Sequence, residues 1–143
     1  MATPETAVEE VLQLVELWNA GDVDIWLEQV DPDLSFRPDP SFPDSGWMRG
    51  EAFHRWMHEW AQTWQGNRLE LLERPSRHGN ATVARARWHL TTLQSGSEVP
   101  VQDFTFIFWE NEHGHLIRFA GLFDHEQALV MAGYREDEVE GAF

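Results

Sequence analysis

The stretch "HRWMHEWAQTW" (residues 54–64) places two imidazoles four residues apart, at His54 and His58. Histidines with this spacing share one face of a helix and can bind one metal ion together. The zinc-peptidase pattern needs a glutamate directly after the first histidine, and Arg55 stands there instead. The sequence shows no third ligand, so we expect a solvated helix face and no metal. His113 and His115 flank a predicted hairpin turn, where we expect exposure.

Carboxylates are the other groups that could carry chemistry. Asp39 and Asp44 lie in the proline-rich stretch "DPSFPDSGWM". Semi-burial among Phe36, Phe42 and Trp47 would raise the pKa of such a carboxyl group toward that of a useful general base. A solvated loop is the simpler interpretation. Asp39 is therefore a candidate base, and both readings stay open.

Composition excludes several reaction classes. The 143 residues include no cysteine, and all ten basic residues are arginine, so thiol nucleophiles and lysine Schiff bases are impossible. The sequence contains no glycine-rich phosphate loop, no dinucleotide-binding fingerprint and no serine-hydrolase elbow. Any chemistry should be proton transfer without a cofactor.

Charge and hydropathy limit the partners. Acidic residues outnumber basic ones 25 to 10, and the net charge of -15 would repel a nucleic-acid backbone. No apolar run approaches the roughly 20 residues of a membrane-spanning helix, and "MATPETAVEEV" does not resemble a signal peptide. We expect a soluble, cytoplasmic protein that binds neither nucleic acid nor membrane.

Three helices should precede the sheet. Apolar residues recur at spacings of three and four between Val8 and Trp18, after a Thr3-Pro4 helix start. Asp22 should cap a short second helix that ends before Pro32. A third helix should span residues 50–64.

The remaining pattern has a period of two. A short strand is expected at 33–38, and four more at 68–74, 81–93, 99–110 and 115–123. Asp124 and Gln127 form a capping box that should begin a last short helix. This order predicts an α+β domain over residues 1–134, with residues 135–143 as an acidic tail.

Alternation predicts which side chains face the core. Trp56 and Trp60 should share the apolar face of the third helix with three other large residues, Phe53, Met57 and Trp64. Trp88 should point inward, whereas Arg85, Arg87 and His89 should point outward and pair with acids such as Asp103. The eight tryptophans exceed what packing alone requires, so some of them could line a ligand site while belonging to the core.

Three stretches carry a resemblance to a known family: "WNAGDVDIWLEQVDPD" (18–33), "RGEAFHRWMHEW" (49–60) and "HGHLIRFAGLFDHEQALVMAGY" (113–134). The chain resembles the SnoaL-like, ketosteroid isomerase-like group of the nuclear transport factor 2-like superfamily. The resemblance implies a cone in which a curved antiparallel sheet wraps an N-terminal helical hairpin and a third long helix. It also implies an internal hydrophobic pocket and homodimers formed through the outer sheet face.

The site residues of this family carry over only in part. The position of the isomerase oxyanion tyrosine holds Leu14, and the position of the cyclase acid holds Gly121. The isomerase base is best matched by Asp39 after a register shift of one residue. Its second acid matches Gln102 or Asp103, and strand parity favours Gln102 as the inward residue.

The sequence supports two functions. The first is a protein that binds a small apolar or aromatic ligand. As an enzyme it would be a metal-free isomerase, cyclase, dehydratase or epoxide hydrolase, with Asp39 as base and Gln102 or Asp103 as polarising partner. The second is a noncatalytic ligand-binding or protein-interaction module. A carboxylate or imidazole with a shifted pKa inside the pocket would favour catalysis, and a wall of indole and phenyl groups alone would favour binding. The predicted pocket residues are Trp18, Phe36, Trp56, Trp60, Trp88, Phe104, Phe119 and Gly121.

Overall fold

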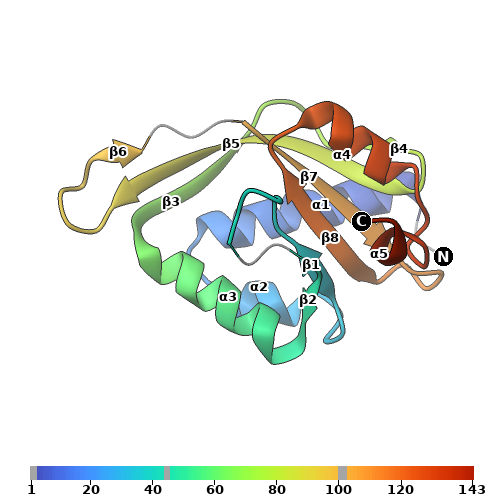
Figure 1. Cartoon of the computed structure of the whole chain (residues 1–143), viewed down its shortest axis with the longest axis horizontal. Coiled ribbons are helices and arrows are strands. Elements are labelled where there is room, and N and C mark those ends of the chain that lie inside the picture. Colours follow the sequence, from blue (N-terminus) through green and yellow to red (C-terminus); the bar gives the residue numbers. More distant parts are fainter. Residues whose placement is uncertain (1–2, 44–45, 100–102) are drawn as a thin grey trace.

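The computed structural model describes residues 3–43, 46–99 and 103–143 and shows helices packed inside a strongly curved sheet (Figure 1). The first two helices form the predicted hairpin, α1 (Pro4–Asn19) and α2 (Val23–Glu28). The Thr3 hydroxyl accepts the N–H of Thr6, and the Asp22 carboxylate accepts the N–H of Ile25, so both predicted caps are confirmed. Helix α3 (Gly50–Thr63) completes this layer.

The described strands form one mixed sheet in the order β2-β1-β8-β7-β5-β3, with β4 and β6 paired to β5. Every pairing is antiparallel except that of β1 with β8, which is parallel. The predicted α+β class is confirmed, and the antiparallel sheet we expected is mixed because the first strand returns beside the last. The strands are β1 (Ser35–Arg37), β2 (Met48–Arg49), β3 (Trp64–Leu71), β4 (Ser76–His78), β5 (Ala81–Thr92), β6 (Glu98–Val99), β7 (Phe104–Glu110) and β8 (Leu116–Leu122).

The junction between α3 and β3 differs from the prediction. We expected residues 66–67 to end the helix and a strand to start at 68, whereas β3 begins at Trp64, directly after the last helical residue. The pairing with β5 is irregular between Trp64 and Gly66. A Cβ at Gly66 would lie 2.6 Å from the Thr91 hydroxyl, so the missing side chain allows the close strand approach there.

The sheet separates two hydrophobic cores. The concave side holds the larger one, in which α1, α2 and α3 pack against the inward residues of β5, β7 and β8. The opposite side holds the smaller one, where α4 (His125–Ala132) covers β5, β7 and β8 (Figure 1). Trp109 lies at its centre, fully buried, and its indole N–H donates to the Tyr134 carbonyl at 3.0 Å.

The segment 135–143, expected to be an acidic tail, instead carries the helix α5 (Val139–Ala142). Val139 is fully buried in the smaller core, Glu140 pairs with Arg49, and the Phe143 carbonyl accepts the guanidinium Nε–H of Arg37 at 3.0 Å. This packing covers part of the outer sheet face, while the homodimer through that face stays a prediction. No helix within the described ranges is long and apolar enough to cross a membrane.

Candidate functional site

A cavity of about 50 Å³ lies between the concave sheet face and the helices α1, α2 and α3. Its wall is made of leucine, valine, alanine, proline, methionine and aromatic side chains. Among the residues that the structure describes, no charged group and no imidazole lines this cavity. The lining residues are Leu14, Val15, Trp18, Trp26, Phe36, Pro38, Phe42, Trp56, Met57, Leu69, Leu71, Ala84, Ala86, Trp88, Phe104, Phe106, Phe108 and Phe119.

Most of the predicted pocket residues meet at this cavity. Trp60 lies directly behind the wall, because its ring stacks on Trp56 with centroids 5.6 Å apart and contacts Trp88 at 4.9 Å. The i, i+4 spacing on α3 produces the Trp56–Trp60 stack, and strand alternation brings Trp88 to face it. The predicted residues in the wall itself are Trp18, Phe36, Trp56, Trp88, Phe104 and Phe119.

Gly121, a predicted pocket residue, is not among the residues that line the cavity. A Cβ at this position would lie 2.9 Å from Cε1 of Phe104 and 3.2 Å from Cε1 of Phe106. The two phenyl rings already occupy the room that the missing side chain creates. Gly121 therefore allows the rings of β7 to lie close against β8, and the cavity opens beside them.

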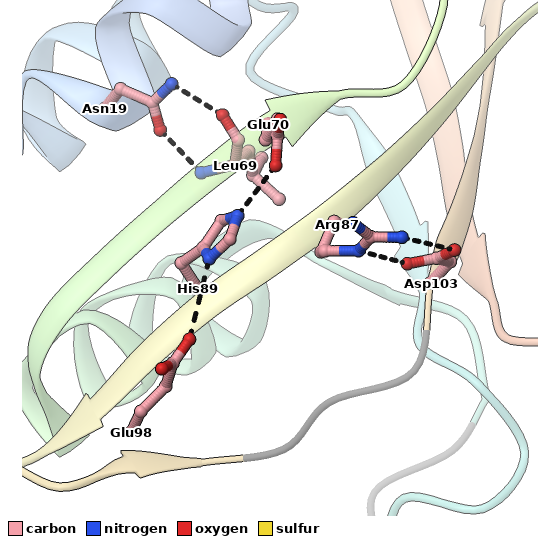
Figure 2. Close-up of polar contacts among 7 residues, drawn as sticks. All are labelled: Asn19, Leu69, Glu70, Arg87, His89, Glu98 and Asp103. Atoms are coloured by element: carbon pink, nitrogen blue, oxygen red, sulfur yellow. Dashed lines mark hydrogen bonds and ion pairs between the residues drawn. The ribbon is translucent and has the colours of Figure 1, made fainter.

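Asn67 is a polar residue beside the cavity that the sequence reading missed. Its Oδ1 accepts the indole N–H of Trp18 at 3.2 Å and that of Trp88. Two residues further along β3, Leu69 is held by Asn19 of α1. The Asn19 amide group donates to the Leu69 carbonyl at 2.9 Å and accepts the Leu69 N–H at 2.7 Å (Figure 2). Asn67 follows a glycine, and in the sequence this pair indicates only the end of a helix.

Asp39 holds the chain at the end of β1 and is not among the cavity-lining residues. Its carboxylate accepts the N–H of Phe123 and the N–H of Ser41, each at 2.9 Å. Burial acts to raise the pKa of Asp39, but these hydrogen bonds outweigh it, so the pKa is lowered. The raised pKa that a base among aromatic rings would need is absent. The carboxylate instead lines a second groove, with Arg37 and Asp124.

Asp103 points to the outer sheet face, as strand parity predicted. Figure 2 shows its carboxylate paired with Arg87, with Nε at 2.9 Å from Oδ1 and Nη2 at 3.4 Å from Oδ2. The hydrogen bond from Arg87 lowers the pKa of Asp103. On the same face His89 lies between Glu70 and Glu98 (Figure 2). Gln102, the alternative to Asp103, lies outside the described residues, as does Asp44.

His58 of α3 contacts protein groups through both ring nitrogens. His58 Nε2 lies 2.8 Å from the Asp24 carboxylate of α2, and Nδ1 lies 2.8 Å from the His54 carbonyl. The contact with that carbonyl, followed by the one with Asp24, raises the pKa of His58. In the described part of the chain, no three His, Cys, Asp or Glu side chains form a group that could hold a metal ion. Asp124 accepts the N–H of Gln127 at 3.1 Å, so the predicted cap of α4 is confirmed.

Comparisons with known proteins agree with this architecture. A family model described as SnoaL-like domain matches residues 11–119. The structure of AusH from Aspergillus nidulans is similar with a TM-score of 0.69 and 16% identity, covering 85% of this chain and 86% of AusH. TerC, co-crystallized with polyporic acid, gives a TM-score of 0.67 at 18% identity over 92% of this chain and 100% of TerC. An NTF2-like protein from Burkholderia thailandensis gives 0.68 at 17% identity over 93% and 98%. No curated protein matches the sequence.

Proposed function

Because the chain belongs to the SnoaL-like domain family, we propose that it binds a small apolar or aromatic molecule in the cavity beneath the curved sheet. The observation that carries this proposal is the cavity wall, which consists of hydrocarbon and indole groups among the described residues. The free energy of transferring an apolar ring from water to such a wall is favourable, by about 25 cal/mol per Å² of buried surface. The co-crystallization of TerC with polyporic acid supports the proposal, because TerC shares the fold.

The size of the cavity indicates how binding must proceed. About 50 Å³ is well below the roughly 300–1,000 Å³ of common ligand pockets. A ligand the size of two fused rings therefore has to displace wall side chains. The half-buried rings of Phe42 and Trp56 are the candidates, because they line the cavity and are still partly exposed to solvent. Binding then favours a more open arrangement than the one in the structure.

Catalysis by acid and base is the second part of this proposal and has weaker support. Asp39 and Asp103 both have lowered pKa values, and both hold their carboxylates in contacts away from the cavity wall. A carboxylate that is fully ionised and already hydrogen-bonded is a weak base at neutral pH. If Asp39 acts as the base on a bound substrate, Asp39→Asn should abolish turnover and leave substrate affinity largely intact.

The binding proposal is tested by filling the cavity from its edge. Leu71 lines the cavity, whereas its neighbour Leu72 is 38% exposed and is not a lining residue. We expect Leu71→Trp to abolish the binding of 2-ethylnaphthalene, measured by isothermal titration calorimetry, because the added indole takes the space of the ligand. Leu72→Trp is the matched control and should bind like the natural chain. Equal binding by both variants would place the ligand elsewhere, and no binding by the natural chain would overturn the proposal.

A further inference from the structure

The indole N–H groups of Trp60 and Trp64 are buried and have no acceptor among the residues that the structure describes. Trp60 lies in the last turns of α3 and Trp64 begins β3, and their ring centroids are 5.6 Å apart at an interplanar angle of 63°. Buried donors are nearly always paired in native proteins, because an unpaired one loses its hydrogen bond to water without replacement. These two donors therefore call for a partner that the described part of the chain does not supply.

The surroundings of Trp60 indicate where that partner would be. Its ring contacts three rings of the cavity wall, those of Phe42 at 5.9 Å, Trp56 at 5.6 Å and Trp88 at 4.9 Å. The indole N–H groups of Trp18 and Trp88 are already bound to Asn67. Asn67 thus pairs the indole donors of Trp18 and Trp88, whereas those of the α3–β3 junction have no acceptor among the described residues. These ring contacts place Trp60 against the cavity wall, so a molecule that fills the cavity is the candidate to supply its acceptor.

We propose that the ligand carries a hydrogen-bond acceptor, such as a ketone oxygen, on an apolar ring system, and that Trp60 Nε1 donates to it. This inference rests on the proposed function, since it requires an occupant of the cavity. Trp64 supplies a second donor beside the first. An indole N–H donates and cannot accept, so a ligand whose only polar group is itself a donor gains nothing from this pair. The indole donors thus recognise the carbonyl group of the ligand, and the cavity wall recognises its rings.

The test uses two probes that share a shape and differ in one group, 2-acetylnaphthalene and 2-ethylnaphthalene. Calorimetric titration should show that the natural chain binds the ketone roughly tenfold more tightly than the hydrocarbon, the effect expected for one good hydrogen bond. Trp60→Phe keeps a ring and removes the N–H, so the two probes should bind it equally.

Trp47→Phe is the matched control. The Trp47 indole N–H is also buried without an acceptor among the described residues, but its ring packs against Trp109 in the core on the other side of the sheet. This variant should keep the tenfold preference for the ketone. Loss of the preference in Trp47→Phe, or its survival in Trp60→Phe, would overturn the assignment to Trp60.

A measurement on the natural chain covers the case in which Trp60→Phe does not fold. In a ¹H–¹⁵N spectrum the indole N–H proton of Trp60 should move downfield with the ketone and not with the hydrocarbon. The same response to both probes would overturn the inference and leave the binding function standing. Binding of neither probe would overturn the binding function and this inference together.

Discussion

The two faces of the curved sheet use the same strands for different packing. On the outer side, small and aliphatic residues such as Ala81, Ile107 and Ala120 are fully buried under α4, and the Trp109 indole N–H is paired with a backbone carbonyl. On the concave side, large rings meet around a hollow, and two indole N–H groups lack an acceptor within the described residues. The outer core is closely packed, whereas the inner core leaves the hollow in which we propose that a ligand binds.

The largest effect should come from truncating one tryptophan on each face. Trp109→Ala removes a fully buried ring and its hydrogen bond, and should cost about 3–5 kcal/mol of unfolding free energy. Trp56→Ala removes a half-buried ring beside existing empty space, so about 1–2 kcal/mol is expected. Urea unfolding of both variants measures the two losses of unfolding free energy. Equal losses would mean that the two cores contribute alike.

A smaller loss should follow from adding one methyl group to the inner face. Gly121→Ala forces the Phe104 and Phe106 rings to shift, and should cost about 1–3 kcal/mol in thermal or urea unfolding. Gly141→Ala in α5 is the control, because a Cβ there meets nothing within 4 Å. A neutral Gly121→Ala would show that the rings of β7 move freely into the cavity.

Asp39→Asn tests whether this carboxylate stabilises the fold. The loss of its charge-assisted hydrogen bonds from Phe123 and Ser41 should cost about 1–2 kcal/mol at pH 7. Because the folded-state pKa is lowered from 3.8, this stabilisation is complete above that value and disappears as the pH falls through the folded pKa. Urea midpoints of the two proteins should therefore converge below about pH 4. A constant difference down to pH 2 would contradict this account.

The smallest effect concerns the contact of α2 with α3. Asp24→Asn should cost less than about 1 kcal/mol at pH 6 and low salt, since the His58–Asp24 pair is exposed. The pKa of His58 is raised above 6.5, so the pair stabilises the fold below that pH and the benefit is lost as the pH rises through the folded pKa. Melting temperatures at pH 6 and pH 9 should show the difference at the lower pH alone. A loss at both would show that the charge of His58 is not involved.

Local patterns predicted the longer helices and strands and six of the eighteen described residues that line the cavity. The caps at Thr3 and Asp124 were readable because the acceptor and the N–H lie three residues apart. Alternation along β5 and β7 placed Trp88 and Phe104 inward, because side chains of a strand point to opposite faces in turn. These rules depend only on near neighbours in the sequence.

Distant contacts were not predictable in the same way. Asp39 is held by Phe123, which lies 84 residues later, and that contact lowers the pKa, which semi-burial alone would raise. Asn67 accepts from Trp18, 49 residues away, so its role depends on how α1 crosses β3. The two-residue strand β2 exists only through its pairing with β1, and α5 through the burial of Val139. Rules based on sequence spacing cannot identify partners that meet only in the folded chain.

The direct passage from α3 into β3 limits how the cavity can admit a molecule. No loop residues separate α3 from β3 and allow them to move independently. A tilt of α3 would therefore pull Trp64 away from Thr92 and disturb the first residue pairs between β3 and β5. Backbone swinging of α3 is thereby coupled to the breaking of sheet hydrogen bonds. Rotation of ring side chains costs no such bonds. The junction therefore favours entry of the proposed ligand by rotation of ring side chains within an unmoved backbone. Amide hydrogens of α3 and the first half of β3 should exchange with solvent as one unit.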